Sequence, residues 1–195
     1  MLGQAYHYTG QYRKEEKLYK KAEQDFPSDY RIIRQQAILA LSKGKSKAAN
    51  GFLDKYLSIR KEAGVTEAGL AANIASIYDA AGILDKAEEH YRKALSLQPE
   101  NLNWVYSLTW FLIDKDRNVD EGLELTNKAL ELNPDDWHLL DTKGWGLYKQ
   151  GKYQEAYNIL QKSWDLRLDK AVYDHEAFLH LETAKKAVAN QKGAQ

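Results

Sequence analysis

The sequence predicts an all-α solenoid, a linear array of antiparallel helix pairs, and three observations lead to this fold class. Glycines recur at a regular interval, since Gly10 and Gly44 lie 34 residues apart and Gly82 follows 38 residues later. Two further series keep the same register, namely Gly3, Ala37, Ala75, Thr109, Gly144 and Glu15, Ala49, Ala87, Gly122, Ala156. Three prolines follow segments with helical patterns, at Pro27, Pro99 and Pro134. A period near 34 residues with such punctuation is typical of repeats that are each one pair of helices.

The repeats follow one another along the chain with two irregularities. Their predicted bounds are 1–29, 30–63, 68–101, 102–136 and 137–170. The first repeat starts inside a helix, because Gly3 is already its small residue and Tyr6 its aromatic residue, so we expect an incomplete repeat. Residues 64–67 are an insertion, and the fourth repeat has one extra residue near Asp116, where the glycine is missing.

A closing segment follows the fifth repeat. Its apolar residues fall at helical spacing, at Tyr173, Ala177, Leu181, Ala184 and Val188. We expect a capping helix over about 171–189, because the end of a repeat array needs a polar outer face. Residues 1–195 are therefore predicted to form a single domain.

The repeats resemble the tetratricopeptide repeat (TPR). The third repeat matches its pattern with Ala75, Tyr78, Gly82, Leu84, Ala87, Tyr91, Ala94, Leu95, Leu97 and Pro99. The fifth matches with Gly144, Leu147, Gly151, Tyr153, Ala156 and Leu160, but has Ser163 for the late alanine and Leu168 for the proline. The resemblance covers about residues 1–170, and the run 139–148 resembles bacterial members. It implies a right-handed superhelix of about five repeats that binds proteins in its concave groove.

Composition excludes several functions. The chain has 28 Lys and Arg against 28 Asp and Glu, so no overall basic field favours nucleic acid as a partner. It has no cysteine, which excludes disulfides, thiolate zinc sites and thiol nucleophiles. No run of 18 apolar residues occurs, so no membrane insertion is expected in this segment. The opening residues are not a signal peptide, and the compartment stays open between the cytoplasm and, after removal of an upstream signal, the periplasm.

The presumed groove is lined by one stripe from the first helix of each repeat. By resemblance these stripes also include Ile38 and Ile113, and their polar and aromatic members form the candidate binding site. That site consists of Arg31, Arg34, Tyr106, Trp110, His138, Asp141, Trp145 and Tyr148. Aromatic residues are common at binding hot spots, and the two arginines suit a carboxylate.

Three interpretations of the groove aromatics remain open. Trp110 and Trp145 either receive a side chain from a partner, or fill the inside of the superhelix without any ligand, or are covered by the closing helix or another protomer. The carboxylate clamp of some family members is not expected, because Arg34 is the one cation at the matching positions.

No catalytic or metal-binding constellation is expected. His175 and His180 are five residues apart, whereas the helical zinc-protease motif needs histidines four apart, so we place both on a polar face of the closing helix. Paired carboxylates such as Glu15-Glu16 are interpreted as caps and solvated charge.

The sequence therefore predicts a protein that is not an enzyme and uses no cofactor and no metal. The leading hypothesis is a protein-protein interaction scaffold that binds a peptide or helix in its groove. The alternative is a structural spacer or oligomerisation arm of a larger protein, with a homo-oligomer formed through the truncated first repeat.

Overall fold

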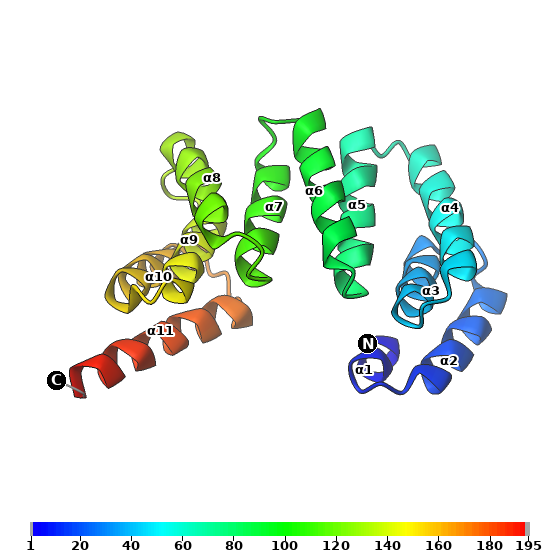
Figure 1. Cartoon of the computed structure of the whole chain (residues 1–195), viewed down its shortest axis with the longest axis horizontal. Coiled ribbons are helices and arrows are strands. Elements are labelled where there is room, and N and C mark those ends of the chain that lie inside the picture. The colour runs from blue at the N-terminus through cyan, green and yellow to red at the C-terminus, as the bar shows by residue number, and fades with distance from the viewer. Residues whose placement is uncertain (1, 194–195) are drawn as a thin grey trace. The chain divides into compact units, whose positions relative to one another are not determined.

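A computed structural model describes residues 2–193, and this part of the chain contains helices and turns but no strand. Its helices are α1 (Leu2–Tyr8), α2 (Tyr12–Asp25), α3 (Tyr30–Ser42), α4 (Ser46–Glu62), α5 (Glu67–Ala80), α6 (Leu84–Leu97), α7 (Leu102–Asp114), α8 (Val119–Leu132), α9 (Trp137–Lys149), α10 (Tyr153–Asp169) and α11 (His175–Gly193). Figure 1 shows them in chain order. The prediction of an all-α array of helix pairs with a further helix at its end is confirmed.

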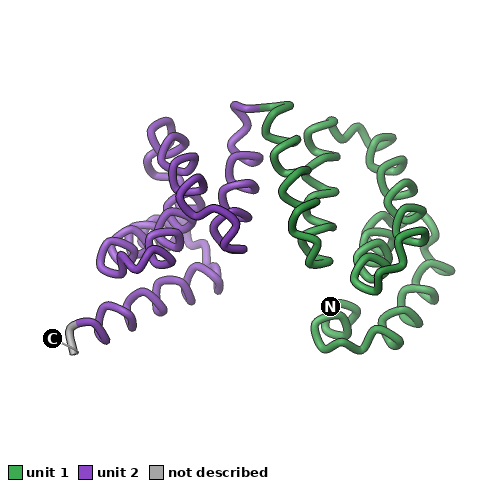
Figure 2. Tube along the Cα trace, in the orientation of Figure 1, with its two compact units in different colours: residues 1–98 green, residues 99–195 purple. Residues whose placement is uncertain are grey.

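The helices form two compact units, which Figure 2 shows in different colours. Unit 1 spans residues 1–98 and holds α1–α6, and unit 2 spans residues 99–195 and holds α7–α11. Each unit is described by itself, and a single domain over 1–195 stays a prediction. All five tryptophans of the chain lie in unit 2, at positions 104, 110, 137, 145 and 164.

The recurring glycines are required by the turn between the two helices of a repeat. Gly82 has a φ of 76°, in the left-handed region that a Cβ atom disfavours. The next amide, that of Ile83, donates to the carbonyl of Tyr78 at 2.9 Å and so closes a Schellman-type cap. In the fourth repeat Asp116 takes the positive φ instead, at 52°, which explains how this repeat turns without a glycine.

Polar residues cap the first helix of several repeats. The side chains of Asp29, Asn101 and Asp136 accept backbone amides at the starts of α3, α7 and α9. Each of these residues stands two positions after a proline, Pro27, Pro99 or Pro134. Each cap satisfies an amide that has no partner within its helix, and it fixes where the helix begins.

Small residues bring paired helices into close contact. A Cβ added to Gly144 of α9 would lie 2.5 Å from Cγ of Leu160 on α10, and one added to Gly122 of α8 would lie 2.6 Å from Cγ1 of Ile113 on α7. Such distances leave no room for a larger side chain, so the small-residue series is a packing requirement.

The closing helix packs against unit 2. Ala177, Leu181 and Ala184 of α11 are buried, as predicted, and the last two belong to the same core cluster as Leu160. The stripe differs at its start, because Tyr173 precedes α11 and is 67% exposed. α11 thereby covers apolar surface of α9 and α10 that water would otherwise reach.

Candidate functional site

Six of the eight candidate residues lie together in unit 2, on α7 and α9. The ring of Tyr106 lies 6.5 Å from that of Trp110 and 5.6 Å from that of His138, measured between centroids. On the second helix, Trp145 and Tyr148 are stacked with their centroids 4.9 Å apart and their planes 2° apart. We call the surface formed by these five rings and Asp141 the inner aromatic surface.

A residue of the closing helix occupies this surface. The imidazole of His180 lies between two tryptophans, with its centroid 4.4 Å from Trp145 and 5.5 Å from Trp110. Its Nδ1 also lies 3.0 Å from Oδ2 of Asp141, and both residues are only 7% exposed. A helix of the chain itself is therefore seated on the inner aromatic surface, as in the third interpretation given above.

His180 corrects one prediction. The sequence interpretation placed it on a polar face of the closing helix, but it is buried. The signal that identifies it is its spacing, because His180 falls at the i+3 position of a stripe that starts at Ala177 and continues to Leu181 and Ala184. The imidazole belongs to the packed face, where its ring stacks and its nitrogen forms a hydrogen bond.

The inner aromatic surface retains two polar atoms without a partner. The indole nitrogen Nε1 of Trp145 and the carboxylate oxygen Oδ1 of Asp141 are buried, and neither has a hydrogen-bond partner in the part of the chain that the structure describes. Buried polar atoms of proteins are usually paired, and a missing partner costs about 1–3 kcal/mol. One donor and one acceptor, four residues apart on α9, are thus available to a further group.

Tyr106 carries a neutral hydroxyl at the edge of the surface. Burial raises the pKa of Tyr106 to about 12, and the nearby carboxylates of Asp141 and Glu176 add to the rise. The group is therefore protonated at every physiological pH, and a phenolic hydroxyl in this state can donate a hydrogen bond.

The two candidate arginines belong to unit 1. Arg31 donates to the carboxylate of Asp29, its shortest distance being 2.6 Å from Nη2 to Oδ2. Arg34 lies with its Nη2 3.3 Å from Oγ of Ser76 on α5. The groove assignment is wrong for Ile38 and Ile113, which are buried in the cores of their units, and for the other residues of the stripe it stays a prediction.

Unit 1 contains a buried carboxyl group that the sequence interpretation missed. Glu15 is fully buried, and its Oε2 lies 3.1 Å from Nδ1 of His7. Glu15 was expected to be solvated, but its repeat position is a small buried one, as Ala49 and Ala156 show. Burial raises the pKa of Glu15, and His7 works in the opposite direction.

Among the described residues, no three His, Cys, Asp or Glu side chains come together in a way that could hold a metal ion. No described helix combines the length and apolar character needed to cross a membrane.

Comparisons with known proteins agree with the helix pairs. A family model, Tetratricopeptide repeat, matches residues 68–101, the third predicted repeat. A TPR repeat-containing protein of Pseudomonas aeruginosa is 34% identical over 98 residues, which are 50% of this chain and 16% of that protein. BBSome complex member BBS4 of Bos taurus is 33% identical over 76 residues, which are 39% of this chain and 14% of that protein. The chain thus spans about a sixth of the length of these relatives.

Solved structures show the same fold. A tetratricopeptide repeat protein from Parabacteroides merdae is similar over 98% of this chain and 73% of its own, with a TM-score of 0.59 and 18% identity. A structure of MamA is similar over 83% of this chain and 90% of its own, with a TM-score of 0.53 and 18% identity. Together with the repeat register and the paired helices, these findings show that the chain has the tetratricopeptide repeat fold, and that its third repeat matches the family model.

Proposed function

We propose that this chain is a non-catalytic protein-binding scaffold, and that its recognition surface is the inner aromatic surface of unit 2. Proteins of this family are generally scaffolds for protein-protein interactions, which supports the class of function. The observation that carries the choice of surface is that it already holds a helix of the chain, α11, through His180.

The contacts of His180 define the partner that fits. A flat ring fits between Trp110 and Trp145, and a donor is needed opposite Asp141. The partner is therefore a helical or extended segment that presents a planar side chain with an N–H or O–H group. A partner group that accepts from Nε1 of Trp145 and donates to Oδ1 of Asp141 satisfies the two atoms that α11 leaves unpaired. Such a segment competes with α11 for the surface.

The experiment compares three variants with wild type as baits in lysate of the source cells. Trp110→Ala/Trp145→Ala removes both ring contacts, His180→Ala weakens only the hold of α11, and Lys128→Ala changes an exposed residue of α8 as a control. We expect the double variant to lose the partner, His180→Ala to retain more of it than wild type, and the control to match wild type. Circular dichroism checks that each variant stays helical.

The alternative function is an oligomerisation arm, and one observation favours it. A surface pocket of about 500 Å³ lies beside the start of α1, between α2 and α3, with Leu18 and Ile32 among its apolar residues. A helix from a second copy is the occupant that this alternative requires. Light scattering of wild type and Leu18→Glu tests it, because a dimer that the variant disrupts supports the oligomerisation arm. Under this alternative, the bait experiment above shows equal retention of partners for all variants.

A further inference from the structure

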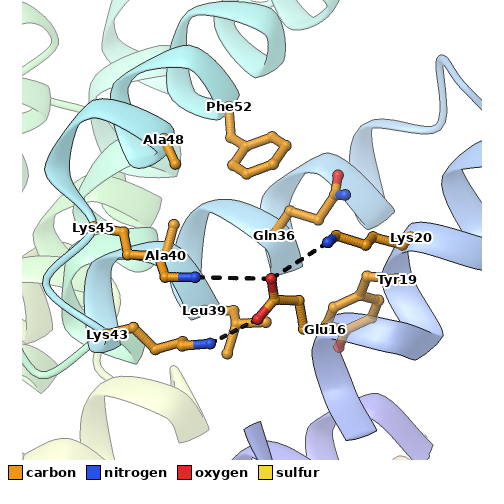
Figure 3. Close-up of a pocket in the computed structure, with 10 residues that line it drawn as sticks. All are labelled: Glu16, Tyr19, Lys20, Gln36, Leu39, Ala40, Lys43, Lys45, Ala48 and Phe52. Carbon is orange, nitrogen blue, oxygen red and sulfur yellow. Dashed lines mark hydrogen bonds and ion pairs between the residues drawn. The ribbon is translucent and has the colours of Figure 1, made fainter. Parts of the chain in front are cut away.

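A second pocket of about 230 Å³ opens in unit 1, among α2, α3 and α4 (Figure 3). Its lining is apolar at the centre, and this part is formed by Tyr19, Leu39, Ala40, Ala48 and Phe52. Figure 3 shows the ring of Phe52 on one side of this space and a group of charged side chains on the other.

The pocket lies where two positions of the repeat lack a large apolar side chain. Ala40 is three residues beyond the small residue Ala37, where the third and fifth repeats have Tyr78 and Leu147. At the third repeat, Tyr78 stacks on His90 with a centroid distance of 5.6 Å. The same place in the second repeat holds only the methyl group of Ala40, so the volume of the pocket stays open.

The second position is that of Glu16, and polar residues also stand there in the second and third repeats, at Asn50 and Glu88. Its counterpart in the fourth repeat is Leu123, which is 8% exposed and packs in the core with Leu147. Leu123 lies so close to Gly146 that a Cβ there would be 2.7 Å from its Cδ2. Leu123 thus fills the space between α8 and α9. The charged Glu16 instead stays at the rim and leaves the space between α2 and α3 open.

Three lysines surround the single carboxylate at the rim (Figure 3). Lys43 Nζ lies 2.6 Å from Oε2 of Glu16, and Lys20 Nζ and Lys45 Nζ lie 3.6 and 3.7 Å from its Oε1. The hydrogen bond from Lys43 lowers the pKa of Glu16, so its carboxylate is ionised at neutral pH. Three positive charges against one negative charge leave the rim with an excess of two positive charges, which favours an acidic ligand.

A buried acceptor also borders the pocket. The amide nitrogen of Gln36 donates to Oε2 of Glu23 at 2.8 Å, and this bond fixes which end of the amide is oxygen. The oxygen, Oε1, is buried, as is the residue as a whole, which is only 6% exposed. This oxygen has no hydrogen-bond partner among the described residues. A ligand with an N–H or O–H group beside its apolar side chain would complete it.

We propose that this pocket binds an aromatic side chain from an acidic segment of a partner protein. The ring enters the space above Leu39 and Ala40, and carboxylates on either side of it replace Glu16 as partners of Lys20 and Lys45. The site lies entirely in unit 1, so it does not depend on the inner aromatic surface of unit 2.

The test is a titration of the ¹⁵N-labelled protein, followed by NMR, with three peptides, acetyl-Glu-Phe-Glu-amide, acetyl-Gln-Phe-Gln-amide and acetyl-Glu-Ala-Glu-amide. We expect saturable shifts at the amides of Gln36, Ala40 and Lys43 with the first peptide. The binding should be weak enough that added salt abolishes these shifts. The second and third peptides lack the charge and the ring respectively, and each should bind at least about threefold more weakly.

Variants locate the binding. Ala40→Leu fills the pocket as Leu147 fills its counterpart, and it should abolish the shifts, while Ala63→Leu at an exposed position should leave them unchanged. Lys20→Gln and Lys45→Gln change exposed side chains and should leave the fold intact. Each should weaken binding about threefold. The proposal is overturned if the first peptide causes no saturable shift, or if its binding survives both Ala40→Leu and the loss of the two lysines. Trp145→Ala should have no effect, which separates this outcome from a failure of the unit 2 surface.

Discussion

Units 1 and 2 are built from the same repeat, but they differ at its junctions. A junction is the contact between the second helix of one repeat and the first helix of the next. In unit 2, Leu123 and Leu147 meet in a continuous apolar core, and Ala156 is the buried small residue of the second helix. In unit 1, Glu16 and Ala40 stand at the matching junction positions, and the fully buried Glu15 takes the small-residue position. The comparison teaches that one backbone pattern can use a junction either for stability or for an open, charged pocket.

The largest expected effect comes from opening a junction in unit 2. Leu123→Ala removes the side chain that fills it and should lower the free energy of unfolding by about 2–3 kcal/mol, since Leu→Ala in cores costs about 2–5 kcal/mol and Leu123 is slightly exposed. Tryptophan fluorescence during urea unfolding measures this, because all tryptophans lie in unit 2. A change below about 0.5 kcal/mol would show that Leu123 is no more important than a surface residue.

The next effect concerns the helix seated on unit 2. His180→Ala leaves Oδ2 of Asp141 buried without its partner and should cost about 1–3 kcal/mol. Tryptophan emission should also change, because the imidazole contacts Trp110 and Trp145. The matched control is His175→Ala at an exposed position of the same helix. Equal results for the two variants would contradict the seating of His180.

Filling the pocket of unit 1 should have a smaller effect of opposite sign. Ala40→Leu buries additional apolar surface in open space and should stabilise unit 1 by about 0.5–2 kcal/mol. Circular dichroism follows this change, while the tryptophan signal of unit 2 stays constant. A loss of stability would mean that the pocket closes around Ala40 in solution and that the comparison between the junctions is wrong.

The smallest effect is a pH dependence in unit 1. Burial raises the pKa of Glu15 above its ordinary 4.5, so its contribution to stability is fully present below that value and is lost as pH rises through the folded pKa. His7, Tyr19 and Lys43 interact with this carboxyl group. Glu15→Gln should remove that part of the pH dependence, measured by urea unfolding at a series of acidic to neutral pH values. An unchanged difference between low and neutral pH would contradict the assignment.

The helix pairs were predictable because each depends on local sequence. Gly82 fixes a turn within five residues, and Asp136 caps a helix within three, so a single sequence shows both. The register of small residues likewise marks Gly144, and the structure shows that a small residue is needed there because it lies against Leu160. Such features repeat along the chain, and their agreement at several positions makes them visible.

The candidate site was only partly predictable, because its decisive contacts are long-range. Asp141 and His180 are 39 residues apart, and nothing in the repeat pattern indicates where the closing helix crosses. Glu15 was missed for a different reason, because its register with Ala49 and Ala156 already indicates a buried position although its charge suggests solvent. The pocket of unit 1 was missed for a third reason, since an absent side chain at Ala40 is recognised only by comparison with Tyr78 and Leu147.

The late position of His180 has a consequence for biosynthesis. A ribosome completes α9 at Lys149, and 30 further residues must be added before His180 itself. Trp110 and Trp145 therefore leave the ribosome before the helix that will contact them, and domains generally fold from the N-terminal side during synthesis. The nascent chain passes through a stage in which the aromatic rings are exposed, and any factor that recognises them has its earliest access at that stage.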